Sequence, residues 1–236
     1  MVIAIDLPKI CKMLPLKTYN LRKTMYKFKI VLCSLAFSLF MAGCAEKNNA
    51  LTIGDASISD ELAFKLNPET WALLSSIDRK TGKRIGGDCS RFITVLNDRN
   101  DNIYFDSSEL MEHMSGGGKS AGIYRLYAAN NAISTENPRP GDLIFFYNTT
   151  SRTKNSKKKQ ITHIGVVRDV YKDGRVGFIH NTRGRNQLDY MNLKKNNTHR
   201  AGTKIENSYI VSCARGDSSC LSANRFAGFG KIAWKL

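Results

Sequence analysis

Cys89 has the sequence surroundings of a reactive thiol. It follows Asp88 and the pair Gly86-Gly87, and apolar residues recur at helical spacing over residues 88–97. Asp88 is a suitable N-cap for this helix, which would place the sulfur in its first turn. The positive end of the helix dipole favours a thiolate there and lowers the thiol pKa. The two glycines allow a second chain to approach closely, and their N–H groups are suited to holding an oxyanion.

A nucleophilic thiolate needs an imidazole as its base. The chain has four histidines, namely His113, His163, His180 and His199. His163 and His180 fall on two apolar segments joined by a turn at 172–175, so a β-hairpin would make them neighbours. Cys89 and this pair therefore form a candidate Cys-His constellation. The alternative from spacing alone is a small buried cysteine with two satisfied core histidines.

Four sequence segments resemble, in order, the signature of the NlpC/P60 peptidases, which are papain-like cysteine hydrolases of the bacterial cell wall. These segments are Asp88-Cys89-Ser90, Arg139 to Phe146 (RPGDLIFF), Thr162 to Val167 (THIGVV) and Phe178-Ile179-His180. Each segment alone is a weak signal, whereas the four in order are specific. The resemblance extends from about residue 80 to 182.

The resemblance implies that Cys89 is the nucleophile, His163 the general base and His180 the residue that orients His163. Asn181 is the alternative third member if the strand register differs by one residue. The implied substrate is a peptidoglycan stem peptide, cut between the γ-carboxyl of D-glutamate and the following diamino acid, and no cofactor is implied. The alternatives are a related amidase or acyltransferase, or a catalytically silent wall-binding lipoprotein.

The chain departs from the family pattern at several positions. Arg91 occupies a position that is usually glycine, and no tyrosine lies between residues 45 and 88, where the family often has one near the substrate. Trp71 or Arg84 is a candidate replacement for that tyrosine. The interval from Cys89 to His163 is long for the family. We therefore consider four residues as substrate contacts, namely Arg84, Asp88, Ser90 and Arg91.

The elements that must position these residues follow from apolar periodicity. Helices are predicted at 59–66, 69–77, 88–97 and 121–132, and strands at 142–147, 161–170, 176–181 and 208–214. Helices that precede strands are typical of an α+β fold, which agrees with the papain-like architecture that the resemblance implies. In this arrangement the cysteine-bearing helix packs on an antiparallel sheet that carries the histidines.

The N-terminal region has the pattern of an export signal. Basic residues precede an apolar run at 30–42 that ends in Ala42-Gly43-Cys44. The run is too short to span a membrane, and a buried core helix is the alternative. The ending resembles a lipobox, which implies a signal peptide at 1–43 (with translation starting at Met25), a lipidated tether at 44–57 and one catalytic domain at 58–236. Acylated Cys44 would anchor the protein at the periplasmic side of a membrane, and Ala45 favours the outer membrane. A mature peptide preceded by residues 1–24 would contradict the start at Met25.

The net charge of the chain indicates which classes of partner it is expected to bind. The chain has 36 Lys and Arg against 20 Asp and Glu, a net charge of +16. Loss of residues 1–43 removes seven basic residues and one acidic residue, which leaves 29 against 19 and a net charge of +10. An exported basic protein is expected to meet peptidoglycan or anionic lipid rather than nucleic acid. The basic run 152–159 is a solvated surface or a contact for an anionic polymer. The oligomeric state does not follow from the sequence.

Cys213 and Cys220 are candidates for a disulfide in an oxidising compartment, and two unpaired thiols are the alternative. The spacing of His and Cys residues does not predict a tetrahedral metal site, and no His-Glu-x-x-His motif is present. No glycine-rich phosphate loop joins a strand to a helix. The sequence therefore predicts an enzyme without metal or cofactor.

Overall fold

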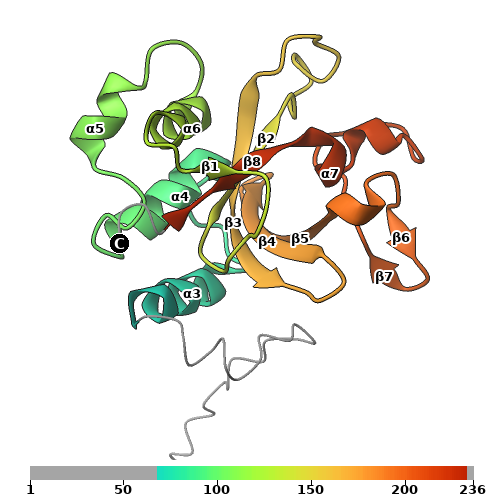
Figure 1. The fold of residues 1–236 in the computed structure, drawn as a ribbon, viewed down its shortest axis with the longest axis horizontal. Helices are drawn as coiled ribbons and strands as arrows, with labels where there is room; N and C mark the ends of the chain where they lie inside the picture. Colours follow the sequence, from blue (N-terminus) through green and yellow to red (C-terminus); the bar gives the residue numbers. More distant parts are fainter. Residues whose placement is uncertain (1–67, 233–236) are drawn as a thin grey trace, which may run out of the picture. The chain divides into compact units, whose positions relative to one another are not determined.

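The two candidate histidines lie on neighbouring strands of an antiparallel sheet, and helices cover one face of that sheet (Figure 1). The structure is a computed structural model that describes residues 68–232. The strand order is β1-β8-β2-β3-β4-β5, and each pair of neighbouring strands for which a register is defined is antiparallel. The predicted α+β class is confirmed.

The bounds of the elements are as follows. The helices are α3 (Pro68–Lys80), α4 (Cys89–Asp98), α5 (Ser107–Glu112), α6 (Lys119–Ala129) and α7 (Ser222–Arg225), with short 3-10 turns at Leu193–Lys195 and Ser218–Cys220. The strands are β1 (Ile133–Ser134), β2 (Leu143–Tyr147), β3 (Ile161–Val170), β4 (Arg175–Thr182), β5 (Arg185–Asn192), β6 (Arg200–Ala201), β7 (Lys204–Ile205) and β8 (Phe226–Gly230).

Alternation along the strands divides the core into two apolar clusters. On β2, Leu143 and Phe145 join the cluster under the helices, whereas Ile144 and Phe146 join the cluster on the other face. The helices contribute residues such as Leu73, Phe92 and Ile123 to the first cluster. A slip of one residue between two strands would turn every side chain of the shifted strand to the opposite face of the sheet. Because both faces pack in separate apolar clusters, this packing defines the register of the strands that carry the histidines.

The helix that carries the cysteine begins where the sequence predicts. Asp88 is the N-cap of α4: its backbone is extended, and its carboxylate accepts a hydrogen bond from the backbone N–H of Arg91 at 2.9 Å. Gly86 has φ +95°, and a Cβ atom there would lie 2.6 Å from the Cα of Phe92. Glycine at 86 therefore lets the entering loop run directly against the first turn of α4.

The Pro-Gly-Asp segment before β2 has a structural role. Asp142 is buried, and its carboxylate accepts hydrogen bonds from the backbone N–H groups of Arg139 at 2.9 Å and Ile232 at 3.0 Å. Lys231 contributes an ion pair to the same carboxylate at 3.2 Å. Burial raises the pKa of Asp142, and these three partners oppose that rise. The motif therefore joins the start of the central strand to the segment that follows β8.

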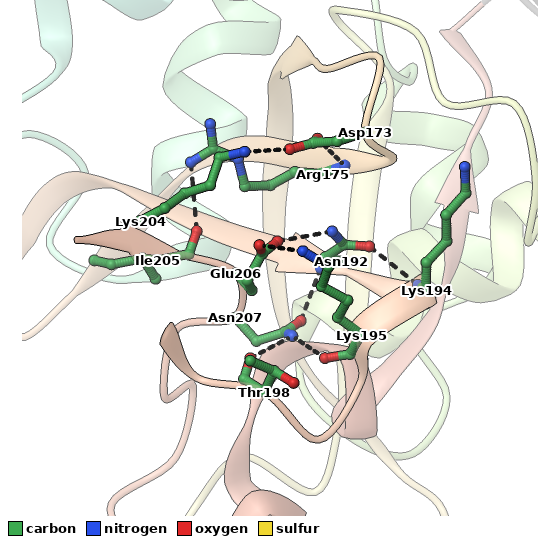
Figure 2. Close-up of polar contacts among 10 residues, drawn as sticks. All are labelled: Asp173, Arg175, Asn192, Lys194, Lys195, Thr198, Lys204, Ile205, Glu206 and Asn207. Carbon is green, nitrogen blue, oxygen red and sulfur yellow. Dashed lines mark hydrogen bonds and ion pairs between the residues drawn. The ribbon is translucent and has the colours of Figure 1, made fainter. Parts of the chain in front are cut away.

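A buried polar cluster fixes the end of β5 (Figure 2). The Glu206 carboxylate accepts hydrogen bonds from the Asn192 side chain at 2.8 Å and from Lys195 at 2.7 Å. The backbone N–H of Asn192 donates to the side-chain oxygen of Asn207 at 2.8 Å. Glu206 and both asparagines are buried, so these bonds satisfy groups that water does not reach. The cluster holds the C-terminal end of β5 in place.

One predicted strand is wrong, and five strands were not predicted, of which β1, β6 and β7 have only two residues each. The segment 208–214 forms only an isolated bridge between Tyr209 and Leu221, because the chain turns back through residues 213–220 before a ladder can extend. Val211 is buried, whereas Tyr209 and Ile210 are half-buried. An apolar run alone does not distinguish such a loop from a strand. The sequence analysis missed β5, which is largely polar, and β8, which contains two glycines.

The predicted helix at 59–66, the signal at 1–43, the acylated Cys44 and the tether at 44–57 lie outside the described residues. Among the described residues, no helix is both long and apolar enough to span a membrane. The predicted helices at 69–77, 88–97 and 121–132 and the strands at 142–147, 161–170 and 176–181 are confirmed, with small differences at their ends. The predicted turn at 172–175 joins β3 to β4.

Gly86→Ala should destabilise the fold more than Gly82→Ala. Both residues have positive φ, at +95° and +76°, but a Cβ at 82 meets nothing within 4 Å. We expect Gly82→Ala to cost about 1 kcal/mol through backbone strain. Gly86→Ala should cost about 1–3 kcal/mol more through its clash with α4. Urea unfolding of the two variants measures the difference, and equal losses would show that the close approach at Gly86 is unimportant.

Candidate active site

Cys89 lies at the N-terminus of α4, where it meets β3 and α6. Its Sγ is 3.6 Å from the hydroxyl of Ser120, a buried residue in the first turn of α6. The imidazole of His163 on β3 and the backbone N–H of Ile164 also interact with the sulfur. The sulfur is half-buried and is the free thiol of the described residues. Ser120 was not found from the sequence, since nothing in the spacing connects it with Cys89.

The structure brings His163 and His180 into direct contact. Nε2 of His163 is 2.6 Å from Nδ1 of His180, across the β3–β4 pair. Nε2 of His180 is in turn 2.8 Å from a carboxylate oxygen of Asp189 on β5. The interacting groups therefore form a continuous series, Cys89–His163–His180–Asp189. The sequence analysis missed Asp189 because the polar strand that carries it was not predicted.

The hydrogen bonds determine which ring nitrogens carry protons. The Asp189 carboxylate accepts, so Nε2 of His180 donates. Burial lowers the pKa of His180, the hydrogen bond with Asp189 opposes that effect, and the net direction is downward. A neutral His180 then accepts at Nδ1 from the Nε2–H of His163. The nitrogen of His163 that remains for the cysteine is Nδ1, which is unprotonated in the neutral ring and suited to take the thiol proton.

The surroundings of Cys89 favour its thiolate. Burial raises its pKa, but the positive charge of His163 and hydrogen bonds from His163, Ser120 and the N–H of Ile164 have a larger opposite effect. Together they lower the pKa of Cys89 to about 7. A substantial fraction of the sulfur is therefore ionised at neutral pH, as a nucleophile requires.

Gly165 provides the room for His180. A Cβ atom at residue 165 would lie 2.9 Å from the carbonyl oxygen of Ile179 and 3.1 Å from the Cβ of His180. Any larger side chain would push β4 away from β3 or displace the imidazole. The glycine of the His-Ile-Gly segment is therefore explained by the packing of His180 against β3.

The other predicted site residues lie around this series. The Asp88 carboxylate accepts from the Ser90 hydroxyl at 2.8 Å as well as from the Arg91 N–H. Arg91 and Arg84 are exposed. The side chain of Asn181, the alternative third member, donates to the carbonyl of Ile85 at 3.1 Å instead of meeting His163. The structure thus places His180, and not Asn181, against His163.

The predicted disulfide joins two cysteines that are not part of the series that begins at Cys89. Cys213 and Cys220 form a disulfide that closes the loop between the Tyr209–Leu221 bridge residues. Asp217 lies close to both sulfurs. Sulfurs joined to each other are not thiolate ligands, so this cluster does not form a zinc-type site.

The sequence pattern of the NlpC/P60 family matches residues 78–206, which include Cys89, His163, His180 and Asp189. The chain belongs to the NlpC/P60 family. Its members are generally cysteine peptidases that act on peptidoglycan. The comparisons found no matching protein of curated function and no matching solved structure.

Alkylation of Cys89 should report its ionisation. We expect the rate of reaction with iodoacetamide to rise with pH around a midpoint of about 7, because the thiolate is the reacting form. His163→Ala should move the midpoint up, and Ser120→Ala should move it up by less, since each removes a group that stabilises the thiolate. Mass spectrometry of the Cys89 peptide measures the rate.

Ser134→Ala is the matched control, because the Ser134 hydroxyl bonds to Glu136. Its midpoint should equal that of the unmodified protein. A midpoint near that of an ordinary thiol in the unmodified protein would contradict the proposed ion pair.

Proposed function

We propose that this protein is a peptidoglycan endopeptidase in which Cys89 attacks an amide bond of the stem peptide. The observation that carries the proposal is the series Cys89–His163–His180–Asp189 within an NlpC/P60 domain. A half-buried thiol with a lowered pKa, beside an imidazole whose tautomer is set by two further groups, is the arrangement of a cysteine protease. In this proposal the fold is the papain-like one that the sequence resemblance implied.

In the first half of the proposed reaction, His163 takes the thiol proton, and the thiolate attacks the amide carbonyl carbon. A C–S bond forms, and the carbonyl π electrons move to oxygen. The N–H groups in the first turn of α4 are suited to stabilise this oxyanion, since they lie at the positive end of the helix. When the intermediate collapses, the C–N bond breaks and the His163 imidazolium protonates the departing amine.

In the second half, water hydrolyses the thioester. His163 takes a proton from water as the oxygen attacks the acyl carbon, and the C–S bond then breaks. The carboxylic acid product leaves, and the proton returns to the Cys89–His163 pair. Each half-reaction passes through an imidazolium at His163. The neutral His180 accepts the Nε2–H of that ring, and the Asp189 carboxylate accepts the Nε2–H of His180.

The proposed substrate bond joins the γ-carboxyl of D-glutamate to the next diamino acid, as the family resemblance implies. The net positive charge of the chain supports an anionic wall substrate. A lipid on Cys44 would hold the enzyme at the periplasmic side of a membrane, within reach of the wall. The anchor is part of the proposal and follows from the sequence pattern at 41–44.

Digestion of purified peptidoglycan tests the reaction. The unmodified protein should release peptide fragments and leave short peptides on the sugars, whereas Cys89→Ala should release none and remain folded. Mass spectrometry of the fragments identifies the bond that is cut. Sugar chains without peptides would instead indicate an amidase. Undiminished release by Cys89→Ala would exclude Cys89 as the nucleophile.

Asp189→Asn tests the outermost member of the series. The variant keeps the size of the side chain but removes the carboxylate that orients His180 and, through it, stabilises the imidazolium of His163, so we expect kcat to fall about 10- to 100-fold with little change in KM. The pH at which activity appears should also move up, because the ion pair is less stable.

Asp189→Glu should recover part of the activity, since it restores the carboxylate. A loss of stability in Asp189→Asn with an unchanged pH profile would show that Asp189 acts only in folding.

A further inference from the structure

A groove of about 750 Å³ lies beside the candidate active site and is lined by four arginines. They are Arg84, Arg183, Arg185 and Arg215, which come from the loop before α4, from the β4–β5 hairpin and from the disulfide loop. The other side chains that line it are polar or apolar, and none is acidic. Four segments distant in sequence, including the start of the β2–β3 connection at Thr149, thus contribute to one surface.

Three contacts connect the groove and its surroundings with residues next to Cys89, His163 and His180. Gly184, at the tip of the β4–β5 hairpin, approaches the carbonyl of Gly87, two residues before Cys89. Gln187, which lines the groove, lies directly opposite His180 in the β4–β5 pair. The backbone N–H of Thr149, which also lines the groove, donates a hydrogen bond to the side-chain hydroxyl of Thr162, the neighbour of His163, at 2.8 Å. A ligand in the groove would therefore extend to the edge of the reaction centre.

The positive charge of the groove is not balanced by its own lining. All four arginines are exposed. Arg185 uses one N–H to bond the carbonyl of Gly82 at 2.9 Å, and its remaining donors are left for other partners. Lys154, from the basic run 152–159, reaches the carbonyl of Ser212 in the groove wall at 3.5 Å. An anion bound among these cations is attracted by all of them and also reduces their mutual repulsion.

The form of the groove favours a peptide over a single small anion. Tyr209, Ile210 and Val211 give one wall an apolar component, and the exposed side-chain amide of Gln187 can pair with a peptide backbone. The Cys213–Cys220 disulfide braces that wall. Arginine binds a carboxylate through two parallel hydrogen bonds, and arginines on several separate segments suit several carboxylates along one chain.

We propose that this arginine groove binds the free carboxylates of the peptide substrate and thereby sets the preference of the enzyme for acidic peptides. The proposal rests on the proposed function, because it takes the groove as an extension of the same active site. A phosphate polymer is a different class of ligand, and the adjoining reaction centre and the amide-pairing groups of the wall favour the peptide.

Binding to the inactive Cys89→Ser protein tests the groove without requiring cleavage. The probe is a fluorescent stem tetrapeptide with free carboxylates, compared with the same peptide in which every carboxylate is an amide. Arg183→Gln with Arg215→Gln should weaken binding of the acidic peptide about tenfold or more, through loss of two charge-assisted contacts. Arg200→Gln, an exposed arginine on β6, is the matched control and should change binding less than twofold.

The amidated peptide should bind weakly to all of these proteins. Equal affinities of the double variant and its parent for the acidic peptide would overturn the proposal. A glycerol phosphate oligomer that binds more tightly than the acidic peptide, with the same dependence on the arginines, would also overturn it and assign the groove to a phosphate polymer.

Cleavage assays with the active protein separate this proposal from the proposed function. If neither peptide is cleaved but binding depends on Arg183 and Arg215, the groove is supported and the peptidase is not. If the acidic peptide is cleaved with the same kcat/KM by the active protein with and without the two arginine changes, the peptidase is supported and the groove is overturned. A rise in KM without a fall in kcat in the double variant supports both.

Discussion

The contact between His163 and His180 is the interaction on which the candidate active site depends. Nε2 of His163 on β3 lies 2.6 Å from Nδ1 of His180 on β4. Glycine at residue 165 leaves the space that His180 needs for this contact. The contact fixes the protonated nitrogen of His163 and so leaves the other nitrogen for Cys89. A shift of one residue between β3 and β4 would turn one imidazole to the opposite face of the sheet. The two apolar clusters, which need opposite faces of each strand, oppose such a shift.

The position of the Cys89 sulfur beside His163 depends on a second constraint, the start of α4. Asp88 caps the helix, and Gly86 lets the preceding loop lie against it. The same loop runs along the β4–β5 hairpin, because Asn186 bonds the backbone of Gly82 at 2.7 Å and of Lys83 at 2.9 Å. The loop therefore joins the helix that carries Cys89 to the strands that carry His180 and Asp189. Stability of the fold and alignment of the reactive groups use the same contacts.

The charges in the site and in its surroundings both favour negatively charged groups. The charge of His163 and three hydrogen bonds lower the pKa of Cys89 despite burial, while the buried His180 has a lowered pKa and stays neutral. The arginine groove beside them adds a positive field that attracts anions toward the reaction centre. The family match includes the four residues of the series. The groove is lined by residues near Arg84, Thr149, the β4–β5 hairpin and the segment 209–215, of which the last lies beyond the family match.

Local periodicity, capping and turn chemistry are enough to predict the helix at Cys89, its Asp88 cap, the two strands that carry the histidines and the α+β class. Which side chains meet depends on long-range packing. Ser120 reaches the sulfur from another helix, and Asp189 reaches His180 from a polar strand without an apolar pattern. The segment 208–214 forms a single bridge instead of a ladder because the chain turns back through the loop that the Cys213–Cys220 disulfide closes. Long-range packing has no signature in local spacing, so these positions required the folded chain.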